Sequence, residues 1–551
     1  MRKAITTLAA VAALVLSASA SAAGWTTSVP LTNVVATSPT TGGGYPVPAG
    51  STVPLAGTCR AGDFNANHSE SWIAVKPGTE DLIGNSKIFF DKYSTFYMFY
   101  LGTVPIHNGT PGPTTQVQGY DCVSTGTQDM PPSWTDNTDP NIGFDLEGRA
   151  YQTTLPFMAF WDGTKLHPDG AIDVSYSDDM GAHWLKGNGG QDLEPAGNPS
   201  AKQLGHVEDK QWIAVNDVGV SPYRDHVYAM WSVFNNNTTK IRIAVSRDRG
   251  QTFSKAVTVT APSQTGPSNT YIYPSVDAAG DLYIAFGAFP LNPNKTPPTL
   301  YVSRSVDDGV TFSPFVAAAT PTPLPGPGDV MPNTTFRDGI IENFAASPTH
   351  PGHLYLTYED WVGTNMDVKF VQSTDGGFTW SVPVTVNDAT NSDTTDQFQP
   401  SVAAGPNGAV AIAFYDRRQA CPNTADVRAA GDVGKTNWCI DTTLQAYKDS
   451  GAGAVPVGPN VRMTKYTWDP MNPIQHVDGI HQMACAGHSN PCTADAFIGD
   501  YFGLAVSNAN IYGYFVSTHY SSNVTADEGG PVYYQQQLLA TVPRSAYGAG
   551  Y

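Results

Sequence analysis

The sequence has few charged residues and no cluster of basic ones beyond its first three positions. Asp, Glu, Lys and Arg make up only 14% of the 551 residues, and 48 acidic residues outnumber 29 basic ones. Because nucleic-acid binding depends on a basic surface, nucleic acid is not an expected partner. After residue 22, no stretch approaches the roughly 20 uninterrupted apolar residues that a membrane-spanning helix needs. The sequence therefore predicts neither a nucleic-acid-binding protein nor a membrane span.

The first residues follow the three-part pattern of a secretory signal peptide. Arg2 and Lys3 precede an apolar run at 8–16, and a string of small residues ends near Ala22. The run is too short to cross a bilayer, so we expect a secreted or periplasmic protein. The expected organisation is a signal peptide at 1–22, an N-terminal extension at 23–58 and a folded domain at 59–551, with long loop insertions at about 105–138 and 419–495.

Six cysteines follow the leader, and an even number in an exported chain predicts disulfides. They are Cys59, Cys122, Cys421, Cys439, Cys485 and Cys492. Pairing Cys421 with Cys439, and Cys485 with Cys492, would each close one long loop. No C-x-x-C pair is present, so no zinc site is expected. We expect no cofactor and no metal at the functional site, although the Asp-rich loop at 387–396 offers oxygen ligands for a structural calcium ion.

Gly, Pro and Tyr are plentiful, with 53, 43 and 26 residues, which is typical of turn-rich β structure. One pattern occurs four times: SDDMGAHW at 177–184, SRDRGQTF at 246–253, SVDDGVTF at 305–312 and STDGGFTW at 373–380. Each copy follows an alternating or β-branched run, which predicts a strand, a tight turn and a second strand. An aspartate in such a turn can accept backbone N–H bonds, and the glycine supplies a positive φ. We therefore assign structural roles to Asp179, Asp248, Asp307 and Asp375.

The shared pattern S-x-D-x-G-x-[TH]-[FW] resembles the Asp-box, or BNR repeat, of sialidases and their relatives. The resemblance implies an all-β fold, a β-propeller in which each box joins the third and fourth strands of a blade. Similar strand pairs recur where no box is recognisable, for example at 400–418 and 503–520. Sialidases of this family have six blades, whereas seven candidate units can be read here. We therefore expect six or seven four-stranded blades, with seven favoured, and Asp-box turns in at least four.

In such a propeller the substrate lies on the face away from the boxes, where the first strands begin. Superposing the apolar strand cores places one residue of each unit there: Glu70, Asp139, Lys210, Tyr273, Ile341, Gln399 and Tyr501. A ring rich in ionisable and aromatic side chains indicates a polar pocket suited to sugars. Packing between blades is the alternative role for the aromatic members.

The resemblance also implies a mechanism. Sialidases grip the substrate carboxylate with three arginines and use a tyrosine, activated by a glutamate, as nucleophile, with an aspartate as acid and base. The matching catalytic candidates are Tyr501, Glu70, Asp209 and Asp139. The candidates for substrate binding are Arg337, Arg417, Arg418, Asp416, Lys210, Tyr273, Glu342, Trp361 and Asp500. For the sequence FYDRR, which contains Asp416, the alternative is an ion pair that holds a loop.

The Arg-Ile-Pro motif that supplies the first of these arginines in sialidases is absent. Three interpretations therefore stay open. The first is an exo-α-sialidase-type glycoside hydrolase that cleaves a terminal acidic sugar. The second is a polysaccharide lyase or another glycosidase acting on an anionic glycan, with Lys210, His519 or Tyr501 as base or acid. The third is a propeller that only binds a glycan or a protein. A glycan is the expected partner, and a monomer is favoured.

Overall fold

The structure is a computed structural model that describes residues 24–37, 68–89, 99–116, 136–158, 169–194, 207–235, 238–290, 297–325, 331, 338, 342–388, 394–419, 439–468, 484–485, 496–521, 535–548 and 550–551. Within these residues almost all regular structure is β. The helices are short: α1 (Pro262–Thr265) and a few 3-10 turns. None of the described helices is long and apolar enough to cross a membrane.

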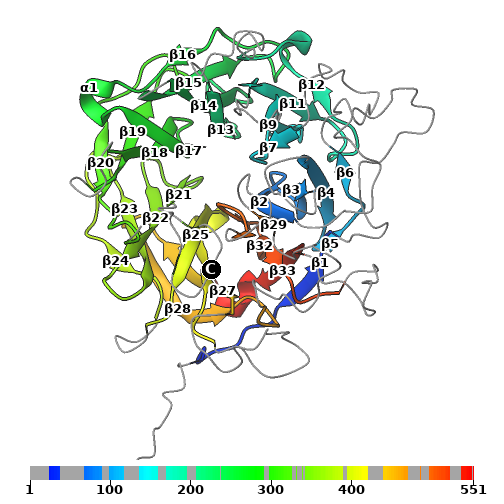
Figure 1. Cartoon of the computed structure of the whole chain (residues 1–551), viewed down its shortest axis with the longest axis vertical. Helices are drawn as coiled ribbons and strands as arrows, with labels where there is room; N and C mark the ends of the chain where they lie inside the picture. Colours follow the sequence, from blue (N-terminus) through cyan, green and yellow to red (C-terminus); the bar gives the residue numbers. More distant parts are fainter. Residues whose placement is uncertain are drawn as a thin grey trace, which may run out of the picture.

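The strands form antiparallel meanders arranged around a central axis, as in a β-propeller, with the first strand of each meander innermost (Figure 1). The first meander consists of β2 (His68–Val75), β3 (Asp81–Phe89) and β4 (Phe99–His107), with the edge strands β5 (Thr110–Pro111) and β6 (Thr115–Gln116). In the second, β7 (Asp136–Thr138) and β8 (Gly143–Phe144) pair with β9 (Ala150–Met158), and β10 (Asp169–Gly170), β11 (Asp173–Ser177) and β12 (Leu185–Lys186) complete it. The third consists of β13 (Val207–Val215), β14 (Val227–Asn235), β15 (Thr238–Ser246) and β16 (Val257–Thr258).

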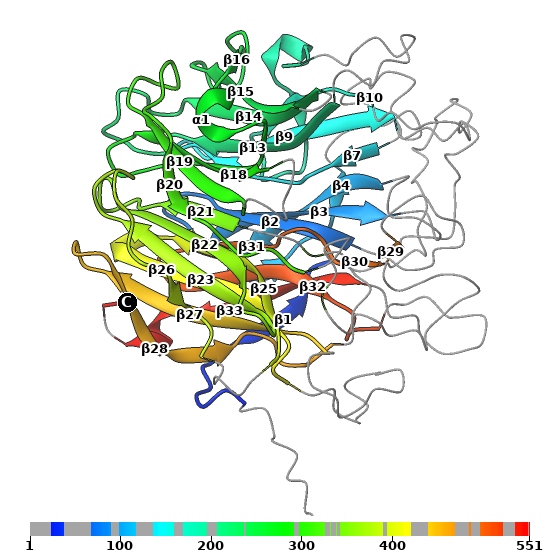
Figure 2. The same ribbon diagram turned by 60° about the vertical axis from the view of Figure 1, so that its left-hand side comes forward.

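The meanders that follow in the chain have the same order from the axis outward. The fourth consists of β17 (Ser268–Val276), β18 (Leu282–Phe289), β19 (Thr299–Ser305) and β20 (Val316–Ala319), and the fifth of β21 (Glu342–Ala346), β22 (Leu354–Trp361), β23 (Met366–Ser373) and β24 (Val384–Thr385). The sixth consists of β25 (Gln397–Ala404), β26 (Ala409–Asp416), β27 (Asp441–Asp449) and β28 (Ala454–Arg462). The last consists of β31 (Gly503–Val506), β32 (Asn510–Ser517), β33 (Gln536–Pro543) and β1 (Thr32–Val35). The hairpin of β29 (Ala484–Cys485) and β30 (Ala496–Phe497) lies on the same side of the ring as β7 and β10 (Figure 2).

The last meander is completed by a strand from the other end of the chain. β1 pairs antiparallel with β33, from Thr32 opposite Thr541 to Val35 opposite Leu538. Residues that we expected to form an extension before the folded domain therefore contribute its final strand. This pairing joins the two ends of the chain within one sheet.

The core lies between neighbouring sheets. All eight side chains of β26, with the sequence AVAIAFYD, are buried. Because a sheet in the ring is covered on both faces, such a strand reads as a continuous apolar run. One cluster joins Tyr355 and Phe370 of one sheet to Ile412 and Phe414 of the next, each at most 1% exposed. Burying an aromatic side chain of this size contributes roughly 1.5–3 kcal/mol, so packing between sheets is a main source of stability.

The four box sequences follow the third strands β11, β15, β19 and β23, and they share one hydrogen-bond pattern. In the last copy, the Ser373 hydroxyl donates to Asp375 Oδ1 at 2.8 Å, and this carboxylate accepts the Thr379 backbone N–H at 3.0 Å. The corresponding aspartates Asp179, Asp248 and Asp307 accept the same bonds. Desolvation alone would raise the pKa of Asp375, but the hydrogen bonds from the Thr379 hydroxyl, the Thr379 backbone N–H and the Ser373 hydroxyl lower it below its usual value. The box aspartates therefore hold turns together.

An Asp375→Asn variant should be less stable than the wild type at neutral pH by about 1 kcal/mol, the modest value expected for a hydrogen-bonded but exposed carboxylate. The folded-state pKa is depressed, so the stabilisation is present above the unfolded-state pKa and is lost as the pH falls through the folded-state value. Urea unfolding at neutral and acidic pH measures this: the difference between the two proteins should shrink in acid. An equal difference at both pH values would contradict the role of the charge.

Candidate active site

Five meanders place a residue with left-handed backbone at or near the start of the innermost strand. These residues are Glu70 (φ 43°), Asp139 (φ 56°), Lys210 (φ 48°), Tyr271 (φ 56°) and Gln399 (φ 44°). At all but Asp139, a bulge shifts the register with the second strand. Left-handed backbone is costly for a residue with a side chain, and its repetition at equivalent positions points to a functional constraint. We refer to these five residues as the axial ring.

Ion pairs hold the charged side chains of the axial ring, one within the sheet of β2 and β3 and one between Lys210 of β13 and the segment that leads into β31. Lys87 Nζ lies 2.6 Å from Glu70 Oε2, and Lys210 Nζ lies 2.9 Å from Asp500 Oδ2. The side chains of both pairs are at most 10% exposed. The Lys210 ammonium also lies 5.1 Å from the centre of the Tyr271 ring. Charges held this tightly give the ring a fixed electrostatic field, because little water is present to screen them.

Two aspartates occupy the part of the ring near Lys210. Asp139 Oδ1 accepts the Thr138 hydroxyl at 3.0 Å, and Asp139 Oδ2 accepts the Lys210 backbone N–H at 3.1 Å. Asp209 is partly exposed and accepts the same N–H at 2.8 Å. Burial of its carboxyl group, reinforced by the charge of Asp139, raises the pKa of Asp209 to about 7. Two neighbouring carboxyl groups in different environments are the usual basis for separate acid and base roles.

More carboxyl groups lie beside the ring in the sheets of β21 and β25. Glu342 is fully buried, and burial raises its pKa well above the usual value. Burial, followed by the proximity of Asp338, likewise raises the pKa of Glu359 well above its usual value. Arg417 is fully buried, with Nη1 3.4 Å from Asp396 Oδ2. This arginine therefore compensates buried acidic groups in the structure as it stands.

Aromatic rings form a floor beneath the axial ring. Trp212 contacts Trp72, Tyr273 and Tyr501, with ring centroids 4.7, 4.9 and 5.0 Å away. The Tyr501 hydroxyl donates to the Pro140 carbonyl at 3.1 Å, and burial raises the Tyr501 pKa well above its usual value. Beyond the floor, the channel widens into a cavity of about 390 Å³ lined mainly by small apolar residues. The floor residues Trp72, Trp212 and Tyr273 thus line this cavity on one side and lie next to the axial ring on the other.

Several predicted residues lie elsewhere or outside the described residues. Arg418 Nε lies 2.7 Å from Asp416 Oδ2, and Arg418 Nη1 lies 2.6 Å from Asp388 Oδ1, so this pair is directed toward the outer strands. Trp361 is half-buried at the end of β22, beside the core cluster of the last two sheets. Arg337, Ile341, Cys59, Cys122, Cys421 and Cys492 fall outside the described residues. Cys439 is buried and disulfide-bonded, and its predicted partner is outside the described residues.

No protein-family model matches the sequence, and no curated protein matches it. Solved structures show a weak likeness. The chain is 14% identical to the Hadza microbial sialidase Hz136, with a TM-score of 0.41 over 64% of this chain and 65% of that one. It is 10% identical to a leech intramolecular trans-sialidase, with a TM-score of 0.41 over 67% of each chain. It is 11% identical to an α-L-arabinofuranosidase of Fusarium graminearum, with a TM-score of 0.35 over 76% of this chain and 95% of that one. Similarity this low supports no inference about activity.

The structure also brings into the site residues that the sequence did not single out. Tyr271 and Lys87 were both missed. In the superposed sequence Tyr273 and Tyr501 were grouped with Glu70 and Lys210, but the structure places both tyrosines one layer lower, in the floor. The spacing of these residues in the sequence could have revealed the two layers. In Glu70-x-Trp72, Lys210-x-Trp212 and Tyr271-x-Tyr273, a residue of the axial ring precedes an aromatic residue of the floor by two positions. The bulge makes this offset invisible to a superposition of strand cores alone.

Proposed function

We propose that this protein is a glycoside hydrolase in which Asp209 is the general acid. The observation that carries the proposal is the position of Asp209: the residue is partly exposed, its carboxylate and that of Asp139 both accept the Lys210 N–H, and its pKa is raised to about 7. A general acid works best when its pKa lies near the pH at which the enzyme operates. Asp209 can therefore hold a proton at neutral pH and deliver it to the oxygen of a glycosidic bond.

Asp139 is the proposed carboxylate partner of Asp209. It accepts two hydrogen bonds and contributes to the raised pKa of its neighbour. The transition state of glycoside cleavage carries positive charge on the sugar ring, which nearby carboxylates stabilise. Asp139 would act on the sugar as base or nucleophile, and Asp500, fixed by Lys210, would add to the field that stabilises this charge.

The sialidase-type form of this proposal uses Tyr501 as nucleophile and Glu70 as its activator. Burial is the largest cause of the raised Tyr501 pKa and Glu70 is the next, so the two side chains lie in each other's field. The Tyr501 hydroxyl, however, donates to a backbone carbonyl and lies in the floor. We therefore assign Tyr501 to shaping the pocket, beneath the carboxyl groups that carry out the chemistry.

The sugar at the reacting position is proposed to be neutral. Both lysines of the site are already paired with carboxylates, and Arg417 is buried beside Asp396. An acidic sugar would bring a further negative charge into a site whose described carboxyl groups outnumber its cations. Specificity for a sialic or uronic acid would need an additional cation, and Arg337 is the candidate that the sequence offers.

The finer architecture and location belong to the same proposal. We infer seven blades, one for each described meander, with Asp-box turns in four of them and β1 closing the last. The leader at 1–22 would direct the protein out of the cytoplasm, where a glycan-degrading enzyme meets its polymeric substrate.

The test is a panel of substrates given to the protein lacking residues 1–22. Release of sugar from neutral fluorogenic hexosides or pentosides is the expected result. Release of sialic acid from a sialoside would show that an acidic sugar is accepted. Absorbance of unsaturated uronate from an anionic polysaccharide would instead show a lyase. Binding on a glycan array without turnover of any substrate would overturn the hydrolase and leave a binding propeller.

A further inference from the structure

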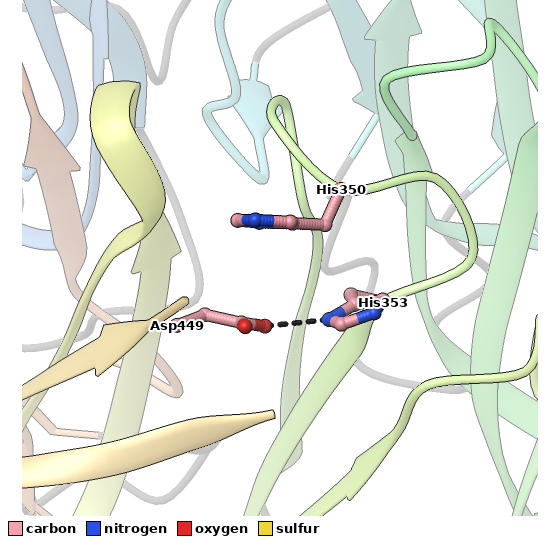
Figure 3. Close-up of side chains that lie close together, drawn as sticks. All are labelled: His350, His353 and Asp449. Atoms are coloured by element: carbon pink, nitrogen blue, oxygen red, sulfur yellow. Dashed lines mark hydrogen bonds and ion pairs between the residues drawn. The ribbon is translucent and has the colours of Figure 1, made fainter. Parts of the chain in front are cut away.

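Two histidines and an aspartate meet between neighbouring sheets, on the face of the ring that carries the boxes. His350 and His353 lie in the turn from β21 to β22, and Asp449 ends β27 of the next sheet. One ligand-capable atom from each lies within 4.8 Å of the others. Figure 3 shows the His350 ring lying over the hydrogen bond between His353 and Asp449. This cluster is at the opposite end of β21 from Glu342 and is thus separate from the axial ring.

The three side chains are held in place by their surroundings. His353 Nδ1 lies 2.6 Å from Asp449 Oδ2, which also accepts the Tyr355 hydroxyl at 2.6 Å, while Asp449 Oδ1 accepts the Gly451 N–H at 2.7 Å. His350 Nδ1 lies 3.0 Å from the Thr349 hydroxyl, which leaves Nε2 of that ring for another partner. Supporting hydrogen bonds of this kind orient the ligands of protein metal sites.

The contact between His353 and Asp449 has an equivalent at a second place, between His226 and Asp308 of two other meanders, where no second histidine lies nearby among the described residues. His226 Nδ1 and the Tyr228 hydroxyl both lie 2.9 Å from Asp308 Oδ1, which repeats the contact made by His353 and Tyr355. The backbone N–H of His226 donates to the carbonyl of Tyr223, just as that of His353 donates to His350. At the second place the residue three positions earlier is Tyr223, and Arg247 Nε lies 2.7 Å from the other Asp308 oxygen.

This comparison separates a packing role from a ligand role. Joining two sheets requires one histidine, one tyrosine and one aspartate, and the pair at His226 and Asp308 does this with an arginine as counter-ion. At both places the ring three positions before the histidine packs against it, with ring centroids 5.1 Å apart for His350 and His353 and 5.9 Å apart for Tyr223 and His226. His350 thus fills a packing position that Tyr223 also fills, and it differs from Tyr223 in offering an imidazole nitrogen. It is half-buried, whereas His353 and Asp449 are buried, so an ion could reach the cluster from solvent on the side of His350.

We propose that His350, His353 and Asp449 bind a divalent transition metal ion of the Zn²⁺ type. Two imidazole nitrogens and one carboxylate oxygen form a ligand set that Zn²⁺ accepts, with water in a fourth position. Bonds of roughly 2.0–2.1 Å to a tetrahedral ion place ligand atoms about 3.3 Å apart. A separation of 4.8 Å, the upper limit in the cluster, would have to shrink by about 1.5 Å, while His353 Nδ1 and Asp449 Oδ2, which are 2.6 Å apart, must move apart by about 0.7 Å. The ion would replace the hydrogen bond between His353 and Asp449, and the half-buried His350 would move toward it. The ion would then cross-link two sheets of the ring.

The test compares the wild type with His350→Tyr, which reproduces the arrangement found at Tyr223. After treatment with a chelator, each protein is titrated with Zn²⁺ by calorimetry and with Co²⁺ by visible absorption. The wild type should bind one more equivalent of Zn²⁺ than the variant and show Co²⁺ bands of a four-coordinate site, which the variant lacks. Zn²⁺ should also raise the unfolding temperature of the wild type only, since binding stabilises the folded state. Equal stoichiometry and affinity in the two proteins would overturn the proposal.

Two further variants make the result specific. His350→Gln removes the same ligand with a smaller side chain, so it replaces His350→Tyr if the tyrosine disturbs folding. His226→Gln weakens the corresponding contact between His226 and Asp308 without changing the proposed ligands, so this variant should keep full Zn²⁺ binding. If His226→Gln lost the equivalent as well, the signal would report the integrity of this face of the ring, and the proposal would be wrong.

Discussion

An Asp209→Asn variant should fold normally and lose at least about a hundredfold in hydrolytic rate, because a general acid typically contributes that much or more. The asparagine keeps the size of the side chain and its bond to the Lys210 N–H through the amide oxygen, but it has no acidic proton to transfer. The loss should be largest for a disaccharide, whose alkoxide leaving group needs the proton. It should be smaller for an aryl glycoside, whose phenolate leaves unaided. The values of kcat/KM for both substrates measure this.

The dependence on pH gives a second measure of the same role. The acid must be protonated, and its pKa is about 7, so the wild-type rate should fall as the pH rises above neutrality. In Asp209→Asn this alkaline fall should disappear. Tyr501→Phe is the control, because it keeps the floor and removes only the hydroxyl. We expect most of the activity to survive in it. A loss in Tyr501→Phe as large as in Asp209→Asn would make Tyr501 the nucleophile, and an unchanged alkaline fall in Asp209→Asn would sink the assignment of the acid.

A Lys210→Met variant should be destabilised by about 3–5 kcal/mol, the cost of leaving one member of a buried ion pair without its partner. Asp500 is 5% exposed and lies 2.9 Å from Lys210 Nζ. Burial alone would lower the pKa of Lys210, but Asp500, Asp139 and Glu70 together raise it well above its usual value. A raised lysine pKa gives a contribution to stability that is complete below the unfolded-state pKa, so the loss should be seen across neutral and acidic pH. The midpoint of urea unfolding measures it.

The matched comparison for Lys210 is a surface arginine. Arg224 Nε lies 2.9 Å from Asp225, but the Arg224 side chain is 46% exposed, so Arg224→Met should cost less than about 1 kcal/mol. The double variant Lys210→Met with Asp500→Leu should recover part of the loss, because it removes the uncompensated charge as well. Equal costs for Lys210→Met and Arg224→Met would show that the Lys210 pair does not organise the ring.

The sequence predicted the order of strands and turns in this protein better than it predicted the residues of the candidate active site. The four boxes and the repeated strand pairs mark where the meanders begin and end, because each local turn is specified by its own Asp, Gly and aromatic residue. The ring residues Glu70, Asp139 and Lys210 follow from that order. Tyr271 does not, because a bulge displaces it from the position that the strand core predicts. Lys87 lies in the second strand of the same meander, and the pairing of β2 with β3 brings it to Glu70.

Charge pairing explains the other differences. In FYDRR, the sequence shows two adjacent arginines at the end of a strand, which suits a carboxylate-binding pocket. The structure gives Arg418 two carboxylate partners, Asp416 and Asp388, and the second of these is far away in the chain. A single sequence shows which residues carry charge, but the partner that neutralises each charge depends on the packing of loops. The cluster of His350, His353 and Asp449 could not be predicted from the sequence for the same reason, because Asp449 comes from another sheet.

The pairing of Thr32 with Thr541 also has a consequence for how the protein comes to be folded. The final sheet needs strands from both ends of the chain, so it cannot be completed until nearly all of the polypeptide has been synthesised. Contacts that are this distant in sequence are slow to form, because the entropy of closing a long loop is lost before the contact stabilises the chain. An open ring missing β1 would expose the edge of β33, which is a hazard for aggregation. Joining β1 to β33 is therefore the pairing that covers this edge and completes the last meander.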